Sequence, residues 1–173
     1  MVPAFAGTTD VERSFMTLPK SFSRTPPSAI SATTIVSAQL TVPTAGRGFT
    51  DLTAEIAKFA KDAGAREGAV TLFIRHTSAS LTIQENADPT VLIDLTTALD
   101  RLAPENAGWR HDTEGPDDMP AHVKTMLTAT SLQIPVLQGE LALGTWQAIY
   151  LIEHRRRPHR REIVLQFAGL TSG

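Results

Sequence analysis

A chain of 173 residues, of which 42% are hydrophobic, is long enough for one domain with a sizeable core. It contains no cysteine, which excludes disulfides and thiolate ligands, so any transition metal must be held by imidazole and carboxylate groups. The formal net charge of −2 offers no attraction to nucleic acid or to an anionic membrane, and neither is expected as a partner. No apolar stretch approaches the roughly 20 residues of a membrane span and no signal-peptide pattern is found, so we expect a cytoplasmic protein.

The first 32 residues differ in character from the rest of the chain. They show no sustained hydrophobic periodicity, and the stretch SFSRTPP at 21–27 is rich in Ser, Thr and Pro. Such a segment buries too little apolar surface to offset the entropy of ordering its backbone. We therefore predict a disordered or extended tail over residues 1–32, with Met16 as an alternative start, and one folded domain over residues 33–170.

The folded part alternates helices and strands at first and then ends in a run of strands. The predicted elements in chain order are a strand at 35–42, a turn at 43–48, a helix at 51–63, strands at 69–75 and 81–84, a helix opened by Asp88-Pro89, a polar loop at 104–118, a helix at 119–127, and strands at 132–136, 145–152 and 162–167. The helix after Asp88 is expected to bury a stripe made of Leu92, Leu95, Leu99 and Leu102. This order predicts a single compact α+β domain with a mixed, largely antiparallel sheet and two to three helices.

The segment from His111 to His122 (HDTEGPDDMPAH) is the densest in titratable groups. Its twelve residues carry two imidazoles and four carboxylates, in a loop whose length is usually explained by function. Gly115-Pro116 makes a tight turn that can fold the two ends together, and Asp118 can cap the next helix. We predict a divalent-metal site here, although the spacing matches no standard zinc motif. A solvated acidic loop with two incidental histidines is the alternative.

His76 lies at the end of the predicted strand at 69–75, where a side chain can project into a cleft from a rigid support. Thr77, Ser78 and Ser80 follow it and offer hydroxyl groups to phosphate oxygens. If the fold brings His76 to the 111–122 loop, three imidazoles would supply the ligand set common in catalytic zinc sites. Taken alone, His76 is more simply explained as a partly buried histidine at a strand-to-turn transition.

Further polar groups flank the predicted strand at 145–152. Trp146 is expected to lie in the core, and Gln147 beside it is expected to have a hydrogen-bond partner. At the other end of the strand, His154 is a candidate fourth metal ligand, or Glu153 is a carboxylate that orients a ligand.

Five arginines lie in the run from Arg155 to Arg161. We expect a solvated hairpin tip, in which the charges also block pairing between strand edges. Capture of a phosphate or pyrophosphate group is the alternative, because guanidinium suits such oxyanions. Arg155 is the member of the run expected to reach a site.

Three segments together resemble the YjbQ-like family, also known as the secondary thiamine-phosphate synthase enzymes. They are HTSASLTIQENADP at 76–89, RHDTEGPDDMPAHVK at 110–124 and LALGTWQAIYLIEHR at 141–155. The resemblance runs from about Thr33 to Ala168, with the motifs in the family's order. It implies a compact α+β domain assembled as a homotrimer, with a bound divalent metal, often zinc.

The resemblance also implies a reaction, in which a pyrimidine methyl pyrophosphate condenses with a thiazole phosphate and pyrophosphate is released. The expected metal ligands are His76, His111 and His122. The metal, with Arg75 or Arg155, would neutralise the leaving group, and Glu114 or Asp112 would position the ring or handle a proton. The expected catalytic residues are thus Asp112, Glu114 and Arg75, and the expected substrate-binding residues are Thr77, Ser78, Asn86, Asp118, Gln147 and Arg155.

Two other functions stay open at this stage. The same ligands could serve a metal-dependent hydrolase of a small phosphorylated metabolite, or the domain could be a metal- or ligand-binding trimer without turnover. Three protein ligands with an open coordination position favour catalysis, whereas a fourth protein ligand favours a structural site. The identity of the metal is open too, because imidazole with carboxylate also suits Mn, Fe, Co and Ni.

Overall fold

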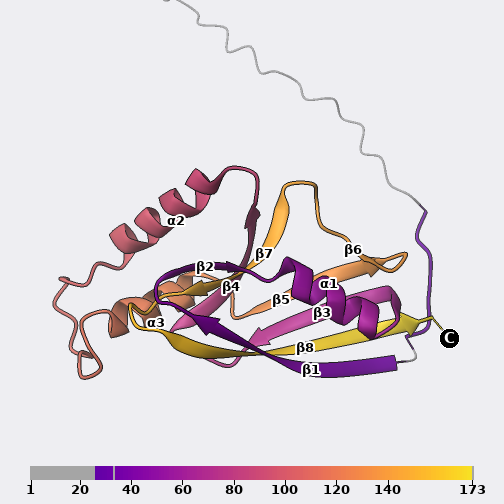
Figure 1. Cartoon of the computed structure of the whole chain (residues 1–173), viewed down its shortest axis with the longest axis horizontal. Coiled ribbons are helices and arrows are strands. Elements are labelled where there is room, and N and C mark those ends of the chain that lie inside the picture. Colours follow the sequence, from indigo (N-terminus) through magenta and orange to yellow (C-terminus); the bar gives the residue numbers. More distant parts are fainter. Residues whose placement is uncertain (1–25, 33, 173) are drawn as a thin grey trace, which may run out of the picture.

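The computed structural model describes residues 26–32 and 34–172 (Figure 1). Its elements in chain order are β1 (Thr34–Thr44), β2 (Gly48–Asp51), α1 (Thr53–Asp62), β3 (Ala65–Ile74), β4 (Ala79–Glu85), α2 (Pro89–Leu102), α3 (Asp118–Leu127), β5 (Ser131–Leu137), β6 (Glu140–Leu141), β7 (Gln147–Glu153) and β8 (His159–Thr171). The predicted tail falls largely outside these ranges, and residues 26–32 carry neither helix nor strand. None of the helices in the described part of the chain has the length and apolarity of a membrane span, and the cytoplasmic location stays a prediction.

The strands form two sheets. One has five strands in the order β1-β8-β3-β5-β6, and the other has three in the order β2-β7-β4. Every strand pair that the structure describes is antiparallel, so the expectation of a mixed sheet is wrong. The α+β class, the single compact domain and the three helices are confirmed.

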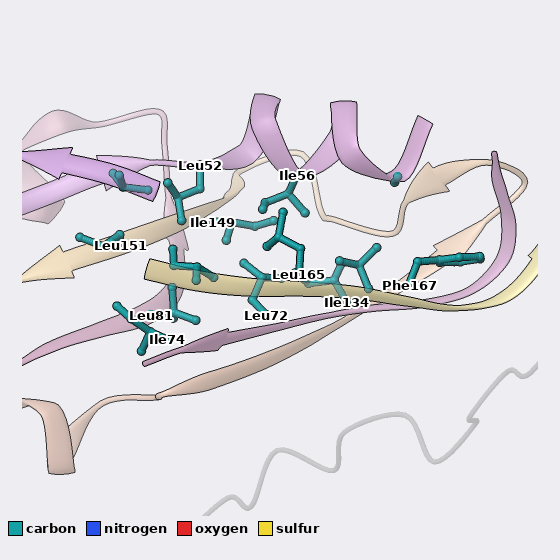
Figure 2. Packing of buried hydrophobic residues seen from close by; sticks show 14 of the residues in the cluster. Leu52, Ile56, Leu72, Ile74, Leu81, Ile134, Ile149, Leu151, Leu165 and Phe167 are labelled. Carbon is teal, nitrogen blue, oxygen red and sulfur yellow. The ribbon is translucent and has the colours of Figure 1, made fainter. Parts of the chain in front are cut away.

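The hydrophobic core joins both sheets to α1 (Figure 2). Alternate residues of β8 face it, with Ile163, Leu165 and Phe167 buried, as the two-residue repeat of a strand requires. Ile56 of α1 is fully buried on the same core. Each such side chain contributes about 1.5–3 kcal/mol to the free energy of unfolding, so the two sheets form a rigid support for the loops at their ends.

Helix α2 is not packed as its sequence predicts. Its start is confirmed, because the Asp88 carboxylate accepts a hydrogen bond from the Thr90 backbone N–H at 2.8 Å and Pro89 is the first helical residue. Leu92, Leu95 and Leu99 are only half-buried, however, and Leu102 is 65% exposed, so the expected full burial of the leucine stripe is wrong within this chain. Figure 1 shows the helix standing away from the sheets, and it chiefly contacts α3, whose buried Lys124 donates a hydrogen bond to Asp100.

The arginine run is not a hairpin tip. The chain leaves β7 in the three-stranded sheet and enters β8 in the five-stranded sheet, so residues 154–158 cross between sheets. The first and last arginines of the run, Arg155 and Arg161, are buried, while Arg156, Arg157 and Arg160 are exposed. The prediction that the arginines are solvated is therefore correct only for the three in the middle of the run.

Candidate metal centre

Three side chains at the start of α3 bring potential ligand atoms together. One atom each of His111, Asp118 and His122 lies within 4.8 Å of the others. His111 Nε2 is 2.9 Å from Asp118 Oδ2, and His122 Nε2 is 3.7 Å from Asp118 Oδ1. Two ligand atoms bound at 2.0–2.2 Å to one ion lie about 3–3.5 Å apart, so the spacing suits a shared cation.

Local structure explains this convergence. Asp118 and His122 are four residues apart on α3 and therefore project from the same face. The loop before the helix turns at Gly115, whose φ of +117° is accessible mainly to glycine, and brings His111 back to the helix start. The expected cap differs, since Asp117 occupies the N-cap position without a side-chain capping bond. The Asp118 carboxylate therefore does not cap the helix and faces the two histidines instead.

A hydrogen bond at the second ring nitrogen of His122 sets the tautomer of the neutral imidazole. Its Nδ1 lies 2.9 Å from the carbonyl oxygen of Thr77, which can only accept a hydrogen bond. Nδ1 must therefore carry the proton, and a neutral ring leaves the lone pair on Nε2, the atom nearest Asp118. Histidine ligands in metal sites are commonly oriented by such a bond to a backbone carbonyl.

Asp118 is held from behind by Arg155. Their side chains are only 3% and 9% exposed, and Arg155 Nη1 donates to Asp118 Oδ1. The same guanidinium donates to Asp117 Oδ2 at 3.2 Å and to the Glu114 carbonyl at 2.9 Å. Burial alone would raise the pKa of Asp117, but hydrogen bonds from the Arg156 backbone and from Arg155 outweigh it and lower that pKa. Arg155, expected to bind substrate, is instead occupied by protein carboxylates.

His76 lies outside this group of three. Its Nε2 accepts a hydrogen bond from the backbone N–H of Glu162 at 2.9 Å, and its Nδ1 is 3.4 Å from Arg161 Nη1. Burial, followed by the charge of Arg161, lowers the pKa of His76 and keeps its ring neutral. The sequence-based ligand set contained His76, whereas the structure brings Asp118 to the third position beside His111 and His122.

Two hollows adjoin the cluster. The first, the His122 hollow, has a volume of about 360 Å³ and is lined by His76, Thr77, His122, Thr125, Met126, Thr128 and Thr130. The second, the Trp109 hollow, has a volume of about 310 Å³ and is lined by Glu105, Asn106, Gly108, Trp109, His111, Asp112 and Pro116. A third depression of about 570 Å³ adjoins the His122 hollow and adds Arg75 and Ser78 to its walls.

The expected catalytic residues are divided between these surfaces. Asp112 lines the Trp109 hollow, and Glu114 is 74% exposed with Oε2 3.4 Å from Arg155 Nη1. Arg75 lies apart from them, with its exposed side chain paired to Glu162 at 3.3 Å. Thr77 and Ser78, expected to bind substrate, line the same depression as Arg75.

Asn86 and Gln147 lie far from the histidines. Asn86 follows β4, and Gln147 is the first residue of β7. The two strands pair with Glu85 opposite Gln147 at one end and Ala79 opposite Glu153 at the other. Six residue steps at about 3.3 Å separate the ends by about 20 Å. Gln147 accepts a hydrogen bond from the Gly144 N–H at 2.8 Å, and Trp146 is 64% exposed, so its expected place in the core is wrong.

Glu153 and His154 are both buried and engaged elsewhere. Burial, then the charge of Lys124, lowers the pKa of His154 to about 4, and its Nε2 lies 2.8 Å from Ser80 Oγ. Glu153 receives hydrogen bonds from Arg161 and from Thr44. Neither is part of the three-residue group, which leaves it without a fourth protein ligand among the described residues.

Sequence reasoning overlooked two residues of this region. Asp117 is buried and anchors the turn to Arg155 and Arg156, although only its neighbour Asp118 had been singled out. Trp109 lines a hollow next to His111. An indole within a polar loop was the available signal, because such a side chain is seldom placed in a loop without a contact to make.

Comparisons with known proteins agree with the architecture. The family model described as "UPF0047 protein YjbQ-like" matches residues 38–170. The UPF0047 protein sll1880 of Synechocystis is 48% identical over 131 residues, which cover 75% of this chain and 89% of that protein. The UPF0047 protein YjbQ of Escherichia coli O157:H7 is 43% identical over 131 residues, or 75% of this chain and 95% of that one.

Solved structures show the same fold. A crystal structure of an uncharacterized conserved protein of the YjbQ/UPF0047 family from Clostridium acetobutylicum has a TM-score of 0.70 at 34% identity, covering 75% of this chain and 98% of that one. A conserved hypothetical protein from Thermus thermophilus has a TM-score of 0.65 at 38% identity, covering 73% and 97%. These names identify a family and state no activity. The chain belongs to the YjbQ-like UPF0047 family.

Proposed function

We propose that this protein binds a divalent metal, zinc in the first instance, through His111, Asp118 and His122. We propose further that it has weak thiamine-phosphate synthase activity, condensing a pyrimidine methyl pyrophosphate with a thiazole phosphate. The observation that carries the metal proposal is the hydrogen bond from His122 Nδ1 to the Thr77 carbonyl, which leaves the Nε2 lone pair beside His111 and Asp118. Two imidazoles and a carboxylate are a common ligand set for zinc and other divalent transition metals.

The ligand count supports turnover rather than a purely structural role. His154, the candidate fourth ligand, bonds Ser80 inside the protein, so three protein ligands would leave coordination positions for a substrate. When bound, the ion would supply a Lewis acid for phosphoryl oxygens.

The His122 hollow supports a phosphorylated substrate. The exposed residues Thr77 and Thr130 line it beside His122, and Arg75 lines the depression next to it. In the proposed reaction the bond from the methylene carbon to the pyrophosphate oxygen breaks, and the thiazole nitrogen forms a new bond to that carbon. The bonding electrons leave with pyrophosphate, so hydroxyl donors and a guanidinium next to the leaving group would stabilise the charge that develops there.

Hydrolysis of a small phosphorylated metabolite is the second candidate. The observation that favours it is Glu114, which is 74% exposed next to the Arg155–Asp118 pair and could accept a proton from an incoming water. The two reactions differ in whether turnover requires the thiazole co-substrate. A metal- or ligand-binding module without turnover would show neither reaction.

We also propose that the chain assembles as a homotrimer, as its family resemblance implies. The support within the chain is uncovered apolar surface, since Ile93 is 64% exposed on a helix that has no fully buried residue. A second copy of the chain would cover such surface.

Elemental analysis beside an activity assay tests the metal and the reaction together. We expect about one zinc-like ion per chain in the parent, and loss of the ion and of turnover in His111→Ala, His122→Ala and Asp118→Asn. His159→Ala is the matched control, because its imidazole bonds the Arg157 carbonyl away from the cluster. A metal-free parent, or variants that keep both ion and rate, would overturn the proposal.

A further inference from the structure

Two hollows adjoin the metal cluster, and each is lined by one of its histidines. His111 lines the Trp109 hollow and His122 lines the His122 hollow. The centroids of the two imidazole rings are only 5.3 Å apart. A ligand held at the cluster therefore has direct access to both hollows, and a ligand with two chemically different ends can place one end in each.

The Trp109 hollow has the walls of a site for a flat ring. Trp109 and Pro116 offer apolar surface, while Asn106 and Asp112 offer hydrogen-bonding groups beside them. Small-molecule sites commonly combine aromatic walls with a few polar groups that fix orientation. The half-buried indole is also held in position, since its Nε1–H donates to the Pro104 carbonyl at 2.8 Å. A fixed indole loses little conformational entropy when a ligand stacks on it.

The His122 hollow has different chemistry. Four threonines and two histidines line it, and the only large apolar side chain among its lining residues is Met126. The hydroxyls of Thr125 and Thr128 donate to backbone carbonyls of α3. The exposed Thr77 and Thr130 can still offer hydroxyl groups to the oxygens of a phosphate, and such walls give a flat ring little to stack on. The two hollows thus differ in the way that the two ends of a phosphorylated heteroaromatic molecule differ.

We propose that the Trp109 hollow is the ring subsite of the proposed metal centre. Trp109 stacks on a planar, nitrogen-bearing ring, and Asp112 accepts a hydrogen bond from an amine on that ring. The phosphate end of the same molecule crosses the cluster into the His122 hollow. The inference rests on the proposed function and deepens it, because it names the residues that select the organic part of the substrate.

The chain contains two tryptophans, and this permits a direct test. Trp146 is exposed about 20 Å from the histidine end of the three-stranded sheet, so in Trp146→Phe the fluorescence comes from Trp109 alone. The probes, each added with zinc, are hydroxymethylpyrimidine phosphate with its exocyclic amine, the phosphate-free alcohol, and inorganic pyrophosphate. We expect the pyrimidine phosphate to quench Trp109 on binding and pyrophosphate to bind without such quenching.

Variants separate the two ends of the ligand. In Trp109→Ala, calorimetry should show the pyrimidine phosphate binding about tenfold or more weakly, with the affinity for pyrophosphate unchanged. Asp112→Asn should keep most of the ring affinity because an amide oxygen also accepts a hydrogen bond, and Asp112→Leu should lose it. Thr130→Val, which removes an exposed hydroxyl from the His122 hollow, should weaken the binding of the pyrimidine phosphate and of pyrophosphate alike.

The outcomes distinguish this inference from the proposed function. Equal affinity of parent and Trp109→Ala for the pyrimidine phosphate would overturn the ring subsite, even if the protein binds metal and turns over substrate. Quenching of Trp109 in a protein that binds no metal would sustain the subsite and overturn the metal proposal. No binding of the pyrimidine phosphate to the zinc-loaded parent would overturn the ring subsite.

Discussion

Arg155 fixes the position of Asp118, because its Nη1 donates to Oδ1 and leaves Oδ2 facing His111 Nε2 at 2.9 Å. The two residues come from different parts of the chain, Arg155 from just after β7 and Asp118 from the start of α3. Their contact is nearly closed to solvent, where a charge-assisted hydrogen bond is both strong and directional. A buried arginine outside the three-residue group thus orients the carboxylate of that group.

Replacing Arg155 should therefore lower the affinity for metal. We expect Arg155→Met to bind zinc or cobalt about 10–100-fold more weakly than the parent, the usual cost of losing a group that orients a ligand. Arg155→Lys should recover part of the affinity, since an ammonium group can still reach one carboxylate oxygen. Titration calorimetry and the absorption spectrum of the cobalt-loaded protein measure the effect.

Arg161→Met is the matched control for this prediction. Arg161 is also buried and paired, but its partner is Glu153 and it does not contact Asp118. Both variants should lower the free energy of unfolding, while Arg161→Met keeps the parent's affinity and cobalt spectrum. Equal losses of affinity in the two variants would show that Arg155 acts only on stability.

Zinc should raise the melting temperature if the cluster binds it in the folded state. An ion at 100 times its dissociation constant adds about 2.7 kcal/mol to the free energy of unfolding, which corresponds to several degrees in a domain of this size. His122→Ala should abolish the shift, and His76→Ala should keep it because His76 lies outside the group. Differential scanning calorimetry with and without zinc decides between the two ligand sets, and loss of the shift in His76→Ala would restore the three-histidine set.

Stability should fall as the pH drops from neutrality towards 5. The folded state lowers the pKa of His154 to about 4, below the ordinary value of 6.5. Between these two pH values the imidazole is protonated in the unfolded chain and neutral in the folded chain. The stabilising contribution is complete above pH 6.5 and is lost as the pH falls from 6.5 to about 4, with about 2 kcal/mol gone by pH 5. Urea unfolding at pH 7.5 and pH 5 measures it.

His154→Gln should flatten this dependence without removing it. His76, whose pKa is also lowered by burial, adds to the slope in the same direction. Glu153 acts in a more acidic range, since its lowered pKa makes stability fall only below its ordinary value of 4.5. A parent and a His154→Gln variant with the same slope would mean that the buried imidazole is not the source.

The mass of the assembly in solution tests the proposed homotrimer. Sedimentation equilibrium should give three chains for the parent. The double change Ile93→Asp with Leu102→Asp should lower the mass, because both side chains are exposed and a carboxylate is costly to bury at an interface. A parent with the mass of one chain at micromolar concentration would contradict the prediction.

Local patterns predicted the part of the site that is local. Asp118 and His122 share a helical face by spacing alone, and the turn at Gly115 that returns His111 to them was evident in the sequence. The twelve-residue segment could therefore be chosen as a site, and its first and last residues do converge with Asp118.

The placement of the other predicted site residues depends on strand register and on contacts between distant segments, which a single sequence does not reveal. Asn86 and Gln147 were grouped with the histidines, but the antiparallel pairing of β4 with β7 carries them to the opposite end of the sheet. Arg155 is expected from the sequence to reach a site because it follows Glu153 and His154. Its carboxylate partners lie 37–41 residues earlier in the chain, so their pairing with it could not be predicted. The sequence predicts a turn that ends at Gly48 and a helix that begins at Asp51, where the structure has strand β2. These four residues become a strand only by pairing with β7.

The hydrogen bond from His122 to the Thr77 carbonyl also limits how the centre could be reused. A synthetic peptide copying residues 111–122 would contain all three ligand side chains. It would lack both the carbonyl from the loop between β3 and β4 that sets the His122 tautomer and the guanidinium that orients Asp118. In such a peptide the ligands would be present and the geometry absent. Transplanting this centre into another protein would therefore require three separate backbone segments, each supplied by a scaffold that already holds them at the right distances.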